Sequence, residues 1–176
     1  AKPVIGGYVV NERAQEFWWS VELNHQKSPH LAEMNIGELE TIAAMVHELT
    51  IGHISHGKIH VKFGDNTGAV RTNASFKTKN QRVMACAAVT ACATNQNNSK
   101  VIARYCRSCL NPADDMTRPD GLVLVQQELG ESKRLETIWP KAVLESTFAD
   151  RTIGAADIMT MAQKSINLSQ HKRSIV

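Results

Sequence analysis

Two short stretches rich in carboxylates are the parts of this sequence most able to do chemistry. Asp65 follows an alternating apolar run and precedes small residues, which predicts that it lies at the C-terminal end of a strand. Asp114 and Asp115 follow Asn111, a candidate helix cap, and open a short helical turn. With Glu38 on an earlier predicted helix, these carboxylates could converge and hold a divalent metal ion. Such a cluster supports phosphoryl-transfer chemistry on nucleic acid.

The composition is that of an ordinary globular protein with a mild basic excess. The 176 residues suffice for one domain with a good core and a short appendage. The sequence is 43% hydrophobic and 21% charged, with a net charge of +3, which permits nucleic-acid binding without requiring it. It shows no apolar run long enough to span a bilayer and no secretory signal. We therefore expect an intracellular protein without a membrane partner.

The four cysteines offer a possible metal site that their spacing disfavours. Cys106 and Cys109 have metal-ligand spacing, and Cys86 and Cys92 could complete a four-thiolate zinc site. However, Cys86 and Cys92 are six residues apart and point in different directions on a helix. Reduced, buried thiols are the favoured interpretation.

Hydrophobic periodicity predicts the order of the structural elements. Strands are expected at 4–10, 17–23, 59–63 and 100–107, a turn at 53–57 and a break at 119–121. Helices are expected at 36–49, with Asn35 as the N-cap, and at 67–74, 81–94, 112–118, 122–129, 139–148 and 155–168.

This order predicts an α/β protein in which an antiparallel hairpin joins parallel strands in one mixed sheet with flanking helices. A strand, a helix and a further strand imply a parallel pairing with a right-handed crossover. Active sites in such sheets lie at the C-terminal ends of the parallel strands, which is where the pattern puts Asp65.

Four stretches recur in an order that is typical of one protein family. They are a glycine-containing hairpin at 5–10 and 17–20, a helix-borne Glu at 35–39, a strand-borne Asp-Asn at 63–70 and an acidic turn at 111–118. Together they resemble the ribonuclease H domain of retroelement reverse transcriptases, particularly the DIRS-like and Ty3-like groups. The resemblance implies a ribonuclease H-like domain over residues 1–118, followed by a helical extension over 119–176.

The resemblance also implies a metal site and its chemistry. Family members hold two Mg²⁺ ions, roughly 4 Å apart, on four carboxylates and hydrolyse the RNA of an RNA–DNA hybrid. By motif, Glu38, Asp65 and Asp114 correspond to three of these catalytic carboxylates. Asp115 competes with its neighbour for the last position.

The fourth carboxylate of the family has no counterpart here. It lies in the first strand, just before the glycines, whereas no acidic residue precedes Ile5 and Glu12 follows the strand. Upstream residues could have been left out, another chain could supply the Asp, or the domain could be degenerate. The N-terminal Ala, which is what Met removal leaves, favours the last alternative. Hydrolysis is therefore expected only if a fourth carboxylate is supplied, and the alternative is a catalytically inactive, domesticated subunit of a nucleoprotein complex.

Basic residues and apolar stripes suggest the partners. Asn66 and the cluster Arg71, Lys77, Lys79 and Arg82 flank or join the Asp-Asn motif and could bind the phosphates of RNA or of an RNA–DNA hybrid. A solvated face is the commoner reason for such a cluster. The extension carries apolar stripes within 122–129, 138–148 and 158–166, some of which we expect to meet another protein chain or nucleic acid.

Overall fold

Two consecutive strands open the chain, and helices and further strands follow them. This computed structural model describes residues 4–23, 31, 33–141, 143–144, 160, 163 and 167. The strands are β1 (Val4–Val10), β2 (Glu16–Glu22), β3 (Ile59–Gly64) and β4 (Lys100–Tyr105). The helices are α1 (Ile36–Ser55), α2 (Thr67–Ser75), α3 (Gln81–Gln96) and α4 (Pro119–Glu128), with short 3-10 helices η2 (Ser108–Leu110), η3 (Pro112–Thr117) and η4 (Glu131–Lys133). These bounds confirm the four predicted strands and the helices expected at 67–74 and 81–94.

Within the described residues, the strands form two separate two-stranded sheets. β1 and β2 pair antiparallel, with Gly7 opposite Trp19. β3 and β4 pair in parallel, with Phe63 opposite Arg104. The α/β class, the hairpin and the parallel pair are therefore confirmed. The single mixed sheet is not seen among these residues, because a cavity separates β1 from β3.

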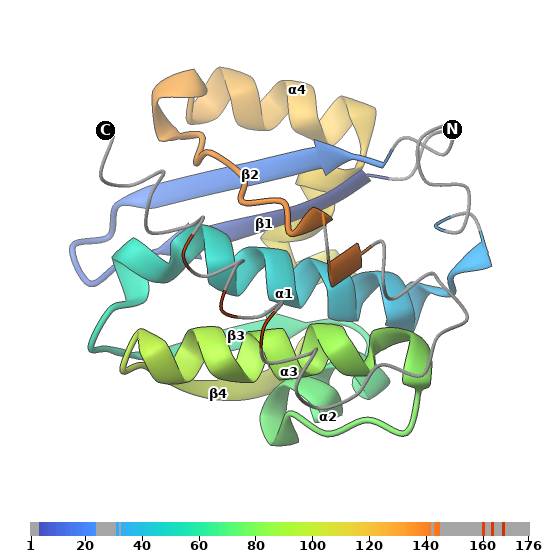
Figure 1. The fold of residues 1–176 in the computed structure, drawn as a ribbon. Coiled ribbons are helices and arrows are strands. Elements are labelled where there is room, and N and C mark those ends of the chain that lie inside the picture. The colour runs from blue at the N-terminus through green and yellow to red at the C-terminus, as the bar shows by residue number, and fades with distance from the viewer. Residues whose placement is uncertain are drawn as a thin grey trace.

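Helix α1 lies between the two sheets and organises the core. Figure 1 shows the β1–β2 hairpin and the β3–β4 pair on opposite sides of α1, with α3 alongside α1 and α4 above the hairpin. Trp18 and Trp19 point to opposite faces of β2, and both are buried. Trp19 joins the main core with α1 and α3, whereas Trp18 packs with Met116 and Val125 beneath α4. Neither ring is available to stack on a base.

Helix α1 begins with a capping box and runs further than predicted. The Asn35 side chain accepts a hydrogen bond from the Glu38 backbone N–H at 2.9 Å, and the Glu38 carboxylate accepts one from the Asn35 N–H at 3.2 Å. The helix continues to Ser55, so the turn predicted at 53–57 is correct only for its last residues. Gly57 follows with a φ of +70°, a conformation that favours glycine.

The break predicted at 119–121 is wrong, since helix α4 begins at Pro119. Proline is favoured at the first position of a helix, where its missing N–H has no intrahelical partner to lose. Gly121 lies inside α4. A Cβ at this position would be 2.5 Å from the Asp115 carbonyl oxygen, so the contact requires a glycine. The glycine therefore marks a close approach of α4 to η3 and does not end a helix.

The chain after residue 118 packs against the rest of the protein as far as it is described. The Leu135 N–H donates to the Trp18 carbonyl at 2.7 Å, and Ile138 and Leu144 belong to the main core. Phe148 and the apolar residues of the stripe expected within 158–166 lie outside the described residues. No helix of the described part of the chain combines the length and apolar character needed to cross a membrane.

The close contact over Gly7 gives a test of the hairpin's packing. A Cβ on Gly7 would lie 2.2 Å from Trp19 Nε1 and 2.6 Å from His47 Nδ1, two atoms joined by a 2.9 Å hydrogen bond. We expect Gly7→Ala to lower the free energy of unfolding by about 2–3 kcal/mol, because these rings must separate. The control Gly64→Ala, whose Cβ would meet only Val70 Cγ2 at 3.2 Å, should cost less than about 1 kcal/mol. Urea denaturation measures both, and equal losses would contradict the proposed packing.

Candidate functional site

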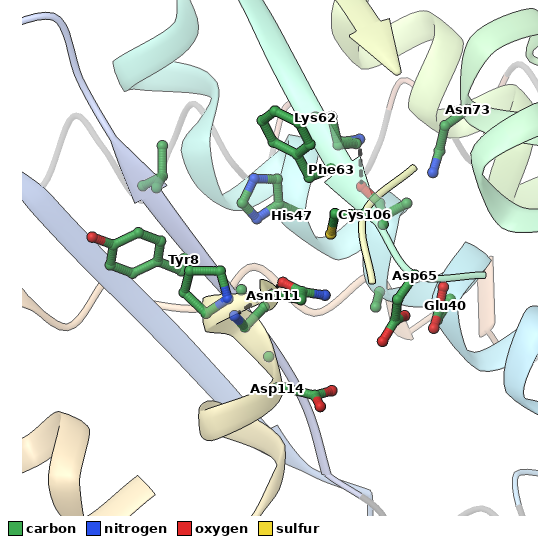
Figure 2. Close-up of a pocket in the computed structure, with 18 of the residues that line it drawn as sticks. Tyr8, Glu40, His47, Lys62, Phe63, Asp65, Asn73, Cys106, Asn111 and Asp114 are labelled. Atoms are coloured by element: carbon green, nitrogen blue, oxygen red, sulfur yellow. Dashed lines mark hydrogen bonds between the residues drawn. The ribbon is translucent and has the colours of Figure 1, made fainter. Parts of the chain in front are cut away.

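A cavity of about 1320 Å³ separates the two sheets. Its floor is the face of α1 that carries Glu40, His47 and Ile51, and its walls are formed by β1 and β3. An ion pair of 2.7 Å between Glu12, just after β1, and Lys58, just before β3, lies at one end. Acidic side chains lie at the other end, as Figure 2 shows.

Three carboxylates from three separate elements line this acidic end. Glu40 comes from the first turns of α1, Asp65 follows the last residue of β3, and Asp114 lies on η3. Figure 2 shows Glu40 and Asp65 side by side, with the Asp114 side chain directed toward the same region. Asp65 and Asp114 are thus brought together as the sequence predicted, and the third member of the cluster is Glu40.

Glu38, which the motif order had assigned to the site, does not line the cavity. Its side chain is only 6% exposed and belongs to the capping box with Asn35. Its second carboxylate oxygen accepts a hydrogen bond from the Asn80 side chain at 3.2 Å. The Glu38 carboxylate therefore holds the start of α1 and the start of α3.

Helix periodicity explains why Glu40 takes the place expected for Glu38. Residues three, four or seven apart share one face of a helix. Glu38 shares a face with Ile42 and Met45, which are buried in the core. Glu40 shares a face with His47, which lines the cavity. The Asn-x-x-Glu capping signature is the feature of the sequence that predicts this difference, because it commits the Glu at its fourth position to the helix terminus.

Glu40 and Asp65 form a charge-coupled pair. Burial, together with the hydrogen bond to Asp65 and its charge, raises the pKa of Glu40 to about 8. The hydrogen bond from Glu40 lowers the pKa of Asp65 despite its partial burial, and the Ser108 side chain adds a further hydrogen bond. At neutral pH, the protonated Glu40 carboxyl therefore donates to an ionised Asp65.

Asp114 stands at the rim of the cluster. Its side chain is 27% exposed and forms a 3.0 Å ion pair with Arg118. Partial burial raises the pKa of Asp114 against the opposing effect of Arg118, and the charges of Asp65 and Asp115 act in the same direction as burial. The Asp115 side chain is exposed and does not line the cavity. Of the acidic pair, Asp114 is the residue that joins the cluster.

The chemistry of the cluster suits a hard divalent cation such as Mg²⁺, which prefers carboxylate oxygens. Glu40, Asp65 and Asp114 would hold such an ion. Within the described ranges, however, no three His, Cys, Asp or Glu side chains already lie close enough to form a metal site. A cation would have to displace the shared proton of Glu40 and compete with Arg118 for Asp114.

A second group of polar side chains lies between α1 and β3. Glu48 is fully buried and forms a 2.7 Å ion pair with Lys62 and a 2.9 Å hydrogen bond with His60. Burial would raise the pKa of Glu48, but Lys62 and His60 together hold it well below its usual range. Burial and Lys62 lower the pKa of His47 to about 3, so the ring is neutral and accepts a hydrogen bond from Trp19.

The predicted nucleic-acid residues lie beside the site but outside the carboxylate cluster. Asn66 caps α2, its side chain accepting a hydrogen bond from the Ala69 N–H at 3.0 Å, and it also lines the cavity. The basic residues are all exposed and lie on α2, on the connection to α3 and on the start of α3: Arg71, Lys77, Lys79 and Arg82.

The cysteines are distributed over different environments. Cys86 is buried in the core and Cys109 is exposed. Cys106 lines the cavity, where burial and then the charge of Asp65 raise its pKa, so the thiol form is favoured there.

Comparisons of the chain with protein-family models, with curated proteins and with solved structures found no match. The geometry of the cavity and its carboxylates therefore provides the grounds for a functional proposal.

The raised pKa of Glu40 predicts a pH-dependent stability. The folded chain holds the Glu40 proton to about pH 8, whereas the unfolded chain releases it near pH 4.5. The stability that protonated Glu40 adds to the folded state is therefore complete below pH 4.5 and is lost as the pH rises through 8. Glu40→Gln has no proton to release at this position and therefore keeps its stability at high pH. We expect the Tm of this variant at pH 9 to exceed that of the parent by about 3–6 °C, with a much smaller difference at pH 5.

The matched control for this prediction is Glu38→Gln, which removes a carboxylate from the same helix outside the cavity. Thermal unfolding followed by circular dichroism from pH 4 to 9 measures all three proteins. A profile that changes in the same way in both variants would contradict the coupling of Glu40 to Asp65.

Proposed function

We propose that this chain is a ribonuclease H-like, nucleic-acid-binding domain derived from a reverse transcriptase, with a divalent-cation site at Glu40, Asp65 and Asp114. The observation that carries the proposal is the convergence of three carboxylates from distant segments in one cavity. Their order along the chain, a helix, a strand end and an acidic turn, is the order that the resemblance implies. The register of the helix motif shifts from Glu38 to Glu40.

The electrostatics of the site support a cation as its ligand. Glu40 retains its proton to about pH 8 because burial and the adjacent Asp65 charge disfavour a second negative charge. A Mg²⁺ ion bound there would supply the positive charge that polarises a phosphate and activates a water. The protein's own contribution is to hold the carboxylates: Ser108 orients Asp65, and the Asn66 backbone N–H donates to Glu40.

A second candidate is a catalytically inactive subunit of a nucleoprotein complex. One observation favours it: β1, which forms a wall of the cavity, has the sequence Val-Ile-Gly-Gly-Tyr-Val-Val and carries no carboxylate. The described site thus has three acidic groups where the family uses four. RNA hydrolysis in an RNA–DNA hybrid requires that a further carboxylate be supplied.

Nucleic acid is proposed to approach over α2 and the start of α3. The exposed side chains of Arg71, Lys77, Lys79 and Arg82 lie on these elements. Asn66 lies at the junction between the basic residues and the carboxylates, since it caps α2 and lines the cavity. A backbone that follows the basic residues would reach the acidic end of the cavity at Asn66.

Cation binding tests the site without requiring activity. Because Glu40 keeps its proton to about pH 8, each Mn²⁺ bound at pH 7 should release about one proton. We expect Asp65→Asn to lower the Mn²⁺ affinity by about tenfold or more, since Asp65 is the ionised ligand of the pair. Isothermal titration calorimetry in buffers of different ionisation enthalpy measures the affinity and the protons released. Asp115→Asn, a neighbouring carboxylate outside the cavity, is the matched control, and equal losses in both variants would contradict the site.

Hybrid binding tests the basic surface. The chain should bind an RNA–DNA hybrid but cleave it very poorly with Mg²⁺, because one carboxylate of the set is missing. Replacing Lys77 and Lys79 by Gln should weaken binding and reduce the slope of log K against log salt by about 2. The control replaces Arg13 and Lys100, two exposed charges elsewhere, by Gln. Brisk cleavage by the parent chain, or the same slope change in the control, would contradict this proposal.

A further inference from the structure

The face of the β3–β4 pair that points away from α1 is apolar and exposed. His60 and Lys62 point toward α1, where both contact Glu48. Because side chains alternate along a strand, the odd-numbered residues of β3 point to the opposite side. Their side chains are 69%, 50% and 60% exposed, and they are Ile59, Val61 and Phe63. Apolar side chains that gather on a surface in this way usually mark an interface.

Two cations flank this apolar row on the neighbouring strand. The parallel register puts every second residue of β4 beside the row, namely Lys100, Ile102 and Arg104. Lys100 and Arg104 are exposed, and neither forms an ion pair within the part of the chain that the structure describes. At roughly 3.3 Å per residue, they are about 13 Å apart along β4. The face thus presents a cation, an apolar centre and a second cation in one line.

Helix α4 carries the opposite pattern on its exposed side. Asp120, Leu124 and Glu128 follow one another at four-residue spacing, and all three are exposed. Leu124 is 54% exposed, and its neighbour Val123 is 51% exposed. Neither carboxylate has an ion-pair partner among the described residues. At roughly 1.5 Å per residue, the two acidic positions are about 12 Å apart along the helix, which matches the spacing of the two cations on β4.

One copy of the chain cannot bring these two surfaces together. α4 lies over the β1–β2 hairpin at one end of the molecule, and the β3–β4 pair lies at the other end, beyond α1 (Figure 1). The inner side of α4 is held in place there, because Val125 packs with Trp18 and Gly121 closely approaches Asp115. The complementary pattern therefore favours a second copy of the chain as the occupant.

We propose that α4 of one copy docks on the β3–β4 face of a second copy. Leu124 and Val123 would cover the apolar row, and the two carboxylates of α4 would pair with the two cations of β4. Because two different patches meet, the contact is heterologous, and it forms a closed two-fold dimer when each copy docks its helix on the other. A nucleic acid fits this face less well, since Phe63 is the one aromatic side chain among its described residues on which a base could stack.

The contact is small, so the association is expected to be weak. A helix of ten residues on two strands buries less than the roughly 1,200 Å² of stable complexes. We expect a dissociation constant on the order of 10 µM at low salt, and a weaker one at high salt because exposed charges are screened.

Charge reversal in the full chain tests the contact. Sedimentation velocity between about 5 and 200 µM, in about 50 mM and about 500 mM salt, measures self-association. One variant combines Asp120→Lys with Glu128→Lys, and the other combines Lys100→Glu with Arg104→Glu. Each should self-associate about tenfold or more weakly than the parent, because like charges then face each other. An equimolar mixture of the two variants should regain the parent's affinity to within about threefold, since every α4 then meets a β4 of opposite charge.

Two matched controls accompany the reversals. Arg13→Glu with Arg82→Glu makes the same change in net charge as the β4 variant at exposed sites elsewhere and should associate like the parent. Phe63→Ser removes apolar surface without changing a charge and should weaken association by about fivefold. Met84→Ser, at an exposed apolar residue of α3, should have no such effect.

The mixture distinguishes docking of α4 from a general effect of charge. Association that is lost in each reversed variant and regained on mixing supports the contact, because mixing cannot repair two misfolded chains. A parent that stays monomeric at about 200 µM overturns it. Equal losses in Phe63→Ser and Met84→Ser, or the same loss in the charge control as in the reversed variants, overturn it as well. A monomeric parent that binds an RNA–DNA hybrid through Lys100 and Arg104 would instead assign this face to nucleic acid.

Discussion

Two adjacent residues of α1 hold the two sheets apart at a fixed distance. His47 accepts a hydrogen bond from Trp19 of β2 at 2.9 Å, and Glu48 pairs with Lys62 of β3 at 2.7 Å. Successive residues of a helix point about 100° apart, so these contacts attach the sheets to different faces of one rigid element. Breaking a buried ion pair by removing one partner costs about 3–5 kcal/mol, which makes the second contact hard to replace. The cavity between the sheets, and the residues that line it, depend on this arrangement.

The carboxylate cluster is a consequence of that rigid frame. The first turns of α1 present Glu40 to the cavity, Asp65 follows the end of β3, and η3 presents Asp114. Because the frame keeps them near one another, the charges cannot relax by moving apart. The frame instead stabilises a shared proton, which raises the pKa of Glu40 to about 8. A carboxylate cluster that keeps a proton at neutral pH can bind a cation in place of that proton. The packing of α1 is thereby linked to the proposed chemistry.

Much of this could be predicted from the sequence, and the failures have physical reasons. Strand alternation and helix periodicity located the strands and α1, and the motif order located Asp65 and Asp114. Motif order alone indicates Glu38, but the capping box commits the Glu38 carboxylate to the helix start, and Glu40 reaches the cavity in its place. The predicted single sheet is not seen among the described residues, because strand pairing depends on tertiary placement. The sequence pattern of β1 is the same whether or not β3 lies beside it. The close approach at Gly121 likewise has no local signal that distinguishes it from a break.

The most direct test of the central claim is the carboxyl pKa of Glu40, measured by ¹³C NMR with and without Mg²⁺. The coupled cluster predicts a pKa near 8 without the ion, because burial and Asp65 favour the protonated form. Added Mg²⁺ should lower it, and Asp65→Asn should lower it as well and remove the response to the ion. A Glu40 pKa near 4.5 that does not change with Mg²⁺ would show that the carboxylates do not form one site.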